Sequence, residues 1–270
     1  MGDWLRHRLP ERVDVAAMLA TQRLVHADGT PVRGDDAFAP HTFVWFHRDL
    51  PDEIEVPGRV TVLHRDERLL VVDKPAFLSS IPRGRHVRES VVVRLRDELG
   101  LPQLSPLHRL DRVTSGLLML ATERRWRGPY QSLFEAGMIR KTYRALAPIR
   151  PDLQLPVTVR DHLIKRRGSW QVEVVSDALV NAETLVALES EIDGMGVYRL
   201  TPRTGKTHQL RVHLNNLGIP IVDDPLYPQI QDIEIDDFSR PLQLLAAELS
   251  FTDPIDGRDR TFRSGLSLPL

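Results

Sequence analysis

Residues 106–121 read PLHRLDRVTSGLLMLA, a polar turn that carries one acidic residue, Asp111, and then continues as an apolar run. The run Leu117–Ala121 follows the turn-forming residues 114–116, and this pattern predicts a strand that enters a hydrophobic core from a tight turn. We therefore expect Asp111 in a loop at the mouth of a strand. Loops that a rigid sheet holds in place often carry the residues that do chemistry.

Two arginines stand on either side of this aspartate. Arg109 and Arg112 flank Asp111, and neighbouring guanidinium groups favour the charged form of a carboxylate. A charged, partly desolvated carboxylate is a candidate nucleophile. The alternative is a structural turn in which Asp111 caps a backbone amide and both arginines are surface charges, because aspartate is a common turn residue. The tetrad HRLD alone does not separate these interpretations.

The wider stretch resembles the signature of a known family. Residues 108–121 are similar to the motif of the RluA family of pseudouridine synthases, roughly HRLD, two variable positions and TSGLLLLA. Lys141–Ala145, KTYRA, resembles the second motif of this family, and 203–213, RTGKTHQLRVH, with 220–227, PIVDDPLY, resembles the third. The resemblance extends from about Val60 to Leu249. It implies an α+β fold, the pseudouridine synthase catalytic core, with a mostly antiparallel mixed sheet, flanking helices and a central active-site cleft.

The same resemblance implies an enzyme that isomerises uridines in RNA to pseudouridine without a cofactor. Asp111 would act as a nucleophile on the base or the ribose, or would remove a ribose proton to open a glycal route. Arg211 would pair with Asp111, and Tyr143 would stack on the flipped base and assist removal of the C5 proton. The resemblance also implies substrate contacts, made by His108, Arg109, Arg112, Thr114, Lys141, Arg203, Lys206, His208 and Leu244.

Several of these residues have an ordinary alternative role. Apart from the resemblance, Tyr143 is most simply a core tyrosine, and Arg211 is most simply an exposed arginine on a helix. Leu244 is equally consistent with a contact to the target uracil and with a plain core position. Arg203 and Lys206 lie near an expected helix start, where free backbone amides suit a phosphate.

The composition is that of an ordinary globular protein. Of the 270 residues, 41% are hydrophobic and none is cysteine, which excludes disulfides, thiolate catalysis and cysteine-ligated zinc. No apolar run approaches the length of a membrane span, and the N-terminus lacks the apolar core of a signal peptide. His208 and His213 lie on different faces of an expected helix, with no acid nearby to complete a metal site. We expect a cytoplasmic protein that needs no metal and does not enter a membrane.

The charges are distributed unevenly along the chain. The net charge of −1 does not favour binding of nucleic acid by bulk charge. Basic residues nevertheless concentrate between 109 and 150 and at 165–167, whereas acidic residues concentrate between 223 and 237. This segregation permits one basic face for a polyanion. The alternative is that the charges belong to solvated helix and loop faces.

The resemblance also suggests a domain organisation and a partner. Residues 1–58 are expected to form an N-terminal extension, in which Leu24–Phe46 resembles at most a remnant of an S4-like RNA-binding domain. Residues 59–270 are expected to form the catalytic domain. The run Ile81–Arg85 looks most like relatives that act on a tRNA anticodon-stem loop and on a 23S rRNA loop. The expected partner is thus an rRNA or tRNA stem-loop with a flipped uridine, bound by a monomer.

Hydrophobic periodicity predicts the remaining elements. Strands are expected at 42–46, 60–63, 69–73, 141–147, 157–159, 170–175, 182–189 and 197–201, the last four as an antiparallel meander. Helices are expected at 13–19, 91–99, 129–138 and 207–217. Ser90 is expected to cap the helix at 91–99 and Gly100 to end it. Residues 242–251 predict a buried strand or the end of a short helix.

Two other classes of protein remain open. The first is a catalytically inactive RNA-binding or ribosome-assembly protein that has kept the fold. The second is a glycoside hydrolase, which also cleaves a C1′ bond but uses two carboxylates. For that chemistry Glu123 or Glu135 would have to supply the second acid, since the motif itself holds only Asp111.

Overall fold

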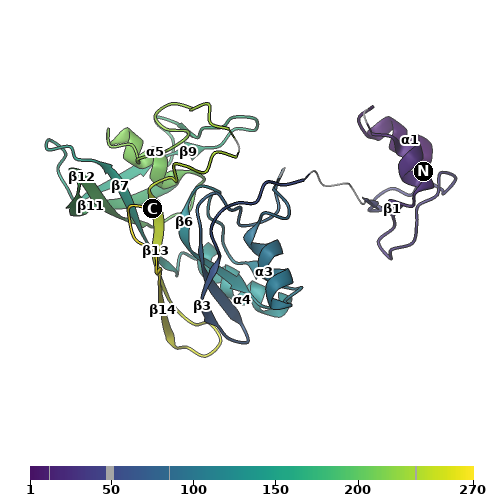
Figure 1. The fold of residues 1–270 in the computed structure, drawn as a ribbon, viewed down its shortest axis with the longest axis horizontal. Coiled ribbons are helices and arrows are strands. Elements are labelled where there is room, and N and C mark those ends of the chain that lie inside the picture. The colour runs from purple at the N-terminus through teal and green to yellow at the C-terminus, as the bar shows by residue number, and fades with distance from the viewer. Residues whose placement is uncertain (12, 47–51, 85, 235) are drawn as a thin grey trace. The chain divides into compact units, whose positions relative to one another are not determined.

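The computed structural model describes residues 1–11, 13–46, 52–84, 86–234 and 236–270. The chain forms two compact units, Met1–Asp52 and Glu53–Leu270, and Figure 1 shows the fold of each. No helix within the described ranges combines the length and the hydrophobicity that a membrane crossing requires.

The first unit has a small core of its own. Its elements are α1 (Gly2–Arg8), α2 (Val15–Ala20), β1 (Leu24–Val25) and β2 (Trp45–Phe46). The two strands pair antiparallel, and the carboxylate of Asp14 caps α2 by accepting from the N–H of Ala17 at 2.9 Å. The buried apolar residues are Leu5, Val15, Leu24 and Val32. The expected helix at 13–19 and the expected strand at 42–46 are both present, but each is shorter than predicted.

The second unit is built on one ten-stranded sheet, with the strand order β3-β4-β6-β13-β7-β12-β11-β8, β5 paired to β6, and β14 paired to β13. The strands are β3 (Thr61–Arg65), β4 (Leu69–Lys74), β5 (Ser105–Pro106), β6 (Ser115–Ala121), β7 (Arg140–Pro148), β8 (Val157–Asp161), β11 (Ala182–Ile192), β12 (Met195–Pro202), β13 (Leu244–Thr252) and β14 (Asp259–Arg263). The helices are α3 (Val91–Leu99), α4 (Arg124–Glu135) and α5 (Gln209–Asn216). Within the described part of this sheet only β6 and β13 pair in parallel. The predicted α+β class with a mostly antiparallel mixed sheet is therefore confirmed.

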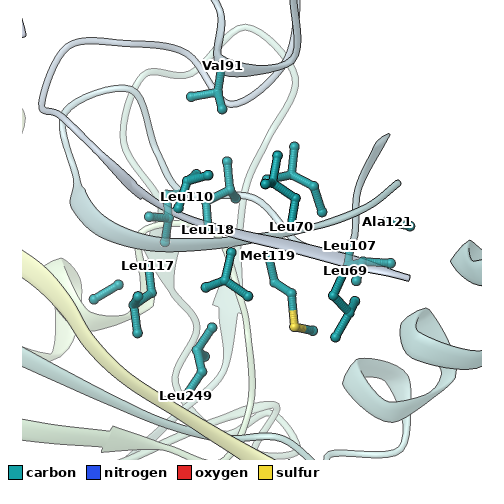
Figure 2. Packing of buried hydrophobic residues seen from close by; sticks show 14 of the residues in the cluster. Leu69, Leu70, Val91, Leu107, Leu110, Leu117, Leu118, Met119, Ala121 and Leu249 are labelled. Carbon is teal, nitrogen blue, oxygen red and sulfur yellow. The ribbon is translucent and has the colours of Figure 1, made fainter. Parts of the chain in front are cut away.

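The core of this unit lies on β4 and β6. Every residue of both strands is buried, as expected for central strands that are covered on both faces. Figure 2 shows the side chains of Leu117 and Met119 in β6 on the same side of these strands as Leu69 of β4 and Leu249 of β13, whereas Leu70 of β4 points to the other side. The expected strand after the polar turn is thus present, and the turn that carries Asp111 is fixed to a rigid base.

The third helix agrees with the prediction, apart from its cap. α3 spans Val91–Leu99, and Gly100 ends it in the left-handed conformation, with a φ of 63°. The predicted cap by Ser90 is wrong. Its hydroxyl donates to the carbonyl of Val87 at 2.8 Å and makes no bond to the helix N-terminus.

The next two helices begin at positions that the sequence did not predict. We expected a helix from Pro129, because proline favours the first turn, but α4 begins at Arg124, whose N–H donates to the side-chain oxygen of Gln103 at 3.2 Å. α5 begins at Gln209, since His208 has a φ of 53° and cannot continue a right-handed helix.

The expected meander is interrupted by a separate small sheet. β8, β11 and β12 are antiparallel neighbours as predicted, and residues 242–251 supply the strand β13. The run at 170–175 instead contributes β10 (Glu173–Val174), which pairs with β9 (Leu163–Ile164) outside the main sheet. The hydroxyl of Ser169 donates to the carbonyl of Gln171 at 2.7 Å, which holds the chain in a turn where a longer strand was expected.

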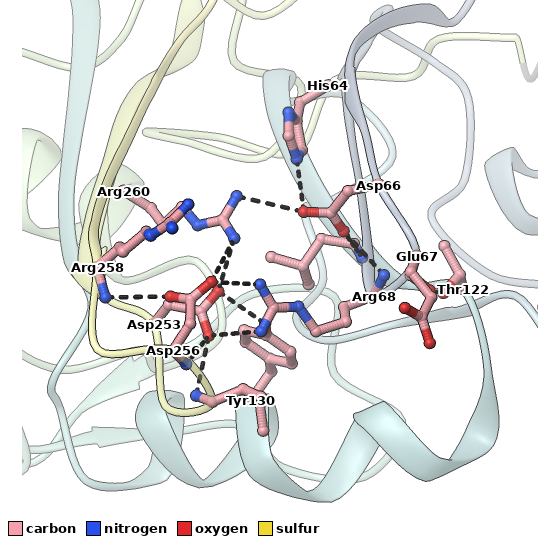
Figure 3. A network of polar contacts seen from close by, with 12 residues as sticks. His64, Asp66, Glu67, Arg68, Thr122, Tyr130, Asp253, Asp256, Arg258 and Arg260 are labelled. Carbon is pink, nitrogen blue, oxygen red and sulfur yellow. Dashed lines mark hydrogen bonds and ion pairs between the residues drawn. The ribbon is translucent and has the colours of Figure 1, made fainter.

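A polar network joins α4 to the hairpin of β13 and β14 (Figure 3). The buried carboxylate of Asp253 accepts from the hydroxyl of Tyr130 at 2.9 Å. Arg68 and Arg260 form ion pairs with the same carboxylate at 3.5 Å and 3.2 Å. Burial and the hydrogen bond to Asp253 raise the pKa of Tyr130, so its hydroxyl keeps the proton that it donates. This network fixes the position of α4 on the sheet.

Candidate active site

The loop that carries Asp111 runs from β5 to β6 and is closed by its own backbone. The N–H of Thr114 donates to the carbonyl of Asp111 at 3.0 Å. Gly116 then has a φ of +103°, and a Cβ at this position would lie 2.4 Å from the carbonyl oxygen of Ala246. Glycine is therefore required for β6 to approach β13 this closely. The Asp111 side chain remains 38% exposed, so it reaches solvent from a rigid base.

Arg211 supplies the cation nearest to this carboxylate. It lies on α5 with only 2% of its side chain exposed, and its Nη1 is 3.5 Å from Asp111 Oδ2. Its Nε and Nη2 donate to the two oxygens of Asp224 at 2.7 Å and 2.6 Å. Burial acts to lower the pKa of Arg211, but the hydrogen bonds and charge of Asp224, together with the charge of Asp111, outweigh it and raise the pKa. One edge of the guanidinium is thus held, and the other faces Asp111.

Asp224 is in turn held by the backbone that follows it. Its side chain is fully buried, and its Oδ1 accepts from the N–H groups of Leu226 and Tyr227 at 2.8 Å and 3.1 Å. The ring of Tyr227 also lies under the guanidinium of Arg211, 5.4 Å from its central carbon. The turn after Asp224 therefore fixes the position of Arg211 from two sides.

His208 borders the same carboxylate as a neutral group. Its Nε2 lies 3.9 Å from Asp111 Oδ2, and its Nδ1 lies 3.1 Å from the hydroxyl of Tyr227. Burial lowers the pKa of His208 to about 4, although the charge of Asp111 acts to raise it. The Tyr227 oxygen already accepts from the N–H of Val172 at 2.8 Å. We therefore assign the Tyr227 hydroxyl as the donor, and Nδ1 of His208 as the acceptor, of the hydrogen bond between these two side chains. In that tautomer the remaining N–H of His208 is on the nitrogen nearest Asp111.

Lys74 holds the far side of the Asp111 loop. It ends β4 with no exposed surface, and its Nζ donates to the carbonyls of Pro75, Leu78 and Arg112 at 2.9 Å, 2.8 Å and 3.0 Å. Burial lowers the pKa of Lys74 to about 7, while the charge of Asp111 acts to raise it and that of Arg112 to lower it. The ammonium has three donors and meets three acceptors, so it ties the residue after Asp111 to the end of β4.

Tyr143 lies across the sheet from this loop. It pairs with Ala246 of β13, which in turn pairs with Gly116 of β6. Burial raises the pKa of Tyr143, and the negative charge of Asp111 raises it further. Its ring is half-buried against the two largest core clusters. The structure therefore brings Asp111, Arg211 and Tyr143 to one region, with the Tyr143 phenol protonated at neutral pH.

His108 has a structural environment. Its Nε2 accepts from the N–H of Met119 at 3.1 Å, and its ring stacks on Phe134 with centroids 4.7 Å apart. Burial lowers the pKa of His108 to about 3, and the charge of Lys141 lowers it further. The ring is thus neutral and is already engaged with protein groups on one nitrogen and one face.

The two arginines that flank Asp111 form no ion pair with it in the described part of the chain. Arg112 turns its guanidinium over the ring of Phe77 at 5.7 Å, and its buried Nη1 has no hydrogen-bond partner among the described residues. Arg109 is exposed and borders a hollow on the other side of the loop. Neighbouring residues in a loop point in different directions, so the charge partner of Asp111 comes from a distant helix.

The remaining predicted substrate contacts are mixed. Lys141 is half-buried and donates to the carbonyl of Thr204 at 3.4 Å, next to the turn that holds the exposed Lys206. Arg203 is exposed and is paired with Glu183 at 2.9 Å. Leu244 is 3% exposed and belongs to a core cluster against which Tyr143 also packs, which favours the plain core position. Arg85, in the basic loop noted in the sequence, lies outside the described residues.

Two residues at this site were not identified from the sequence. Asp224 entered the sequence analysis within the third motif, residues 220–227, and among the clustered acids, but neither Asp224 nor Lys74 was assigned a role at the site. The feature that could have identified Asp224 is its place as the second aspartate of the run Asp223-Asp224-Pro225, which follows the residues of α5. The signal for Lys74 is a lysine that directly continues an apolar run and precedes a proline.

Comparison with known proteins identifies the family of this chain. A sequence profile of the family described as RNA pseudouridylate synthase matches residues 68–216, more than half of the chain. The dual-specificity RNA pseudouridine synthase RluA of Vibrio cholerae is 33% identical over 202 residues, which cover 72% of this chain and 78% of that protein. RNA pseudouridine synthase 7 is 32% identical in rice and 33% identical in Arabidopsis thaliana, and the chain spans about half the length of these plant relatives, 48% and 45%.

Solved structures show the same fold. Human RNA Pseudouridylate Synthase Domain Containing 1 superposes with a TM-score of 0.62 at 23% identity, over 77% of this chain and 85% of that one. Human RNA Pseudouridylate Synthase Domain Containing 4 gives a TM-score of 0.58 at 23% identity, over 77% and 89%. From the profile match and the extent of the Vibrio cholerae match, the chain belongs to the RluA-type family of RNA pseudouridine synthases.

Proposed function

We propose that this protein converts uridines in RNA to pseudouridine, with Asp111 as the reacting group. The observation that carries the proposal is an accessible carboxylate, Asp111, that faces a buried Arg211 already fixed by Asp224. The reaction breaks the C1′–N1 bond and forms a C1′–C5 bond. One proton leaves C5 and one arrives at N1, so the product is an isomer of the substrate and no other reactant is consumed.

Asp111 acts at the start of this sequence. It either attacks the ribose or the base through a carboxylate oxygen, or removes a ribose proton and opens a glycal route. Arg211 holds the carboxylate through its remaining Nη1 edge, and charge-assisted contacts of this kind are short and directional. Because Asp224 fixes the guanidinium before substrate arrives, Arg211 needs no reorganisation during the reaction.

Tyr143 acts on the uracil. Its ring offers a face on which a flipped base stacks. Because its pKa is raised, the phenol of Tyr143 is neutral and can accept the C5 proton only if it gives its own proton to another group at the same time. The carboxylate of Asp111 is the expected acceptor of that proton, because its charge already acts on the phenol.

The substrate that suits this site is a uridine in an RNA loop. Extruding a base costs a few kcal/mol and costs least where the base is unpaired. An rRNA or a tRNA stem-loop supplies such uridines. The half-buried Arg112, which pairs with no carboxylate among the described residues, is a suitable donor to a phosphate beside the flipped nucleotide.

Release of tritium from RNA that carries 5-tritiated uridine tests the proposal. The wild-type protein is expected to release tritium from rRNA or tRNA without added metal or coenzyme. Deletion of the gene, followed by mapping of the pseudouridines that disappear, then identifies the RNA. RNA binding with no tritium release from any cellular RNA would contradict the proposal and favour an inactive RNA-binding protein with this fold.

A further inference from the structure

A groove lined by arginines leads away from the Asp111 loop. A hollow of about 370 Å³ lies between β5 and α4, and its lining includes His108, Arg109, Arg127 and Gln131. A second hollow of about 500 Å³ is lined by Arg96, Gln103, Ser105, Arg124 and Arg127. Ser105 and Arg127 border both hollows, so the two adjoin each other. We call this feature the arginine groove and define it by Arg96, Arg109, Arg124 and Arg127.

Among the described residues, no carboxylate neutralises the charge of the arginine groove. No aspartate or glutamate among the described residues lines either hollow, and none of the four arginines forms an ion pair with a carboxylate in the described part of the chain. The neighbouring Arg125 behaves differently. It pairs with Glu67 and Glu123, both at 3.0 Å, and covers the ring of Trp126. Guanidinium groups without a carboxylate partner are thus gathered on one side of α4.

Two of these guanidinium groups are already oriented. Arg96 donates through Nε to the carbonyl of Leu104 at 3.0 Å, and Arg127 donates through Nε to the side-chain oxygen of Gln131 at 3.3 Å. In each case the Nη groups remain for another acceptor. Arg124 is the first residue of α4, where the helix dipole adds positive potential. The groove therefore presents aligned donors to an anionic chain.

The groove is connected to the reacting group by the chain itself. His108 and Arg109 border it and belong to the same loop as Asp111. The net charge of −1 gives the protein no bulk attraction for RNA, so local cations without carboxylate partners must supply that attraction. Arginine forks match the oxygens of a phosphate, and phosphate contacts set the register of a nucleic acid without reading its sequence.

We propose that the arginine groove binds the phosphates of the RNA strand that flanks the target uridine. This inference rests on the proposed function, because it takes RNA as the substrate at Asp111. The groove acts on binding and register, while the chemistry stays with Asp111, Tyr143 and Arg211. Substitutions in the arginine groove are therefore expected to raise KM for long RNA and to leave kcat unchanged.

The test compares two double variants of the full chain with equal loss of charge. R124Q/R127Q removes two cations of the groove, and R125Q/R263Q removes two cations that pair with surface carboxylates. Binding to a fluorescent stem-loop RNA is measured at several salt concentrations. The groove variant is expected to raise Kd at least tenfold and to reduce the slope of log Kd against log salt by about 0.7 for each phosphate that the protein no longer binds. The control variant R125Q/R263Q is expected to leave both Kd and the slope close to the wild-type values.

RNA length provides an independent arm. A short RNA that ends close to the target uridine does not reach the groove, so wild type and R124Q/R127Q are expected to bind it equally. R96Q/R109Q, which changes the other side of the groove, is expected to repeat the effect on long RNA. Thermal unfolding of each variant shows whether the fold is intact.

The outcomes separate this inference from the proposed function. If R124Q/R127Q and R125Q/R263Q bind long RNA alike while the wild type releases tritium, the groove assignment is overturned and the function stands. If the wild type releases no tritium, the function fails, and the binding comparison still decides the groove. Binding of poly-glutamate that depends on Arg124 and Arg127, with RNA binding unaffected, would overturn the assignment to RNA in favour of an acidic protein partner.

Discussion

At the scale of single residues, the site depends on how Arg211 is held. A buried guanidinium is stable only when its donors are satisfied, and Asp224 satisfies two of them at 2.6–2.7 Å. The remaining edge is then available to Asp111. The partner of Asp111, the proposed reacting group, is thus fixed by a third residue, Asp224.

Replacing Asp224 by asparagine tests this support. Asp224→Asn leaves the buried charge of Arg211 uncompensated, so we expect a loss of unfolding free energy of roughly 3–5 kcal/mol and a fall in kcat of at least tenfold. Denaturant titration and tritium release measure the two effects. The matched control is Asp223→Asn, because Asp223 has a φ of 56° that asparagine tolerates. Equal stability of the two variants would show that Asp224 does not support Arg211.

The buried histidine of the Asp111 loop predicts a pH dependence of stability. The pKa of His108 is lowered by burial from its ordinary value of 6.5 to about 3. Between these values the unfolded chain binds a proton that the folded chain does not, so the unfolding free energy rises as the pH increases from 3 to 6.5. At about 1.4 kcal/mol per pKa unit, the rise amounts to a few kcal/mol. His108→Gln should flatten this part of the stability profile, and an unchanged profile would contradict the assigned burial.

The residue scale is also where the sequence was least informative. The motif identified Asp111, Tyr143 and Arg211, which the structure brings to one region. It did not identify Asp224, because the turn that folds Asp224 back onto α5 leaves no periodic signal. The two arginines beside Asp111 were expected to favour its charged form, but neither forms an ion pair with it in the described part of the chain, because adjacency along a loop does not determine the direction of a side chain.

At the scale of elements, the site depends on the close parallel contact between β6 and β13. Gly116 permits that contact, and Lys74 ties the loop before β6 to the end of β4. The sequence predicted β4 and β6 because the apolar runs of these two strands are continuous. It misplaced the start of α4 because the side chain that satisfies Arg124, Gln103, comes from another segment.

A glycine-to-alanine pair tests the contact between the strands. Gly116→Ala places a methyl group against the Ala246 carbonyl at a positive φ, so we expect a loss of roughly 3 kcal/mol or more in unfolding free energy. Gly128→Ala, inside α4 with no neighbouring atom within 4 Å, is expected to stabilise by about 0.5–1 kcal/mol. The midpoints of denaturant unfolding measure both. A Gly116→Ala protein as stable as the wild type would refute the argument from close approach.

At the scale of the whole molecule, segregation of charge matters more than its sum. The chain carries a net charge of −1, yet arginines without carboxylate partners among the described residues line the groove that leads from the Asp111 loop. The sequence indicated an excess of basic residues in this part of the chain. It could not show which cations are neutralised by carboxylates, because pairs such as Arg125 with Glu67 join distant segments.

This distribution predicts that RNA binding depends strongly on salt in spite of the net negative charge. Contacts to phosphates release counterions, so log Kd is expected to rise linearly with log salt, with a slope of about 0.7 per contact for single-stranded RNA. Fluorescence anisotropy across a salt series measures the slope. An affinity that is independent of salt would contradict a binding mode based on phosphate contacts.

The most direct test of the central claim is single-turnover release of tritium by wild type and by Asp111→Asn. The substitution keeps the size of the side chain and removes its negative charge. We expect tritium release to fall by about three orders of magnitude or more, as for loss of an essential reacting group, with the affinity for RNA and the unfolding midpoint nearly unchanged. Turnover by a folded Asp111→Asn protein at the wild-type rate would contradict the claim that this carboxylate carries the reaction.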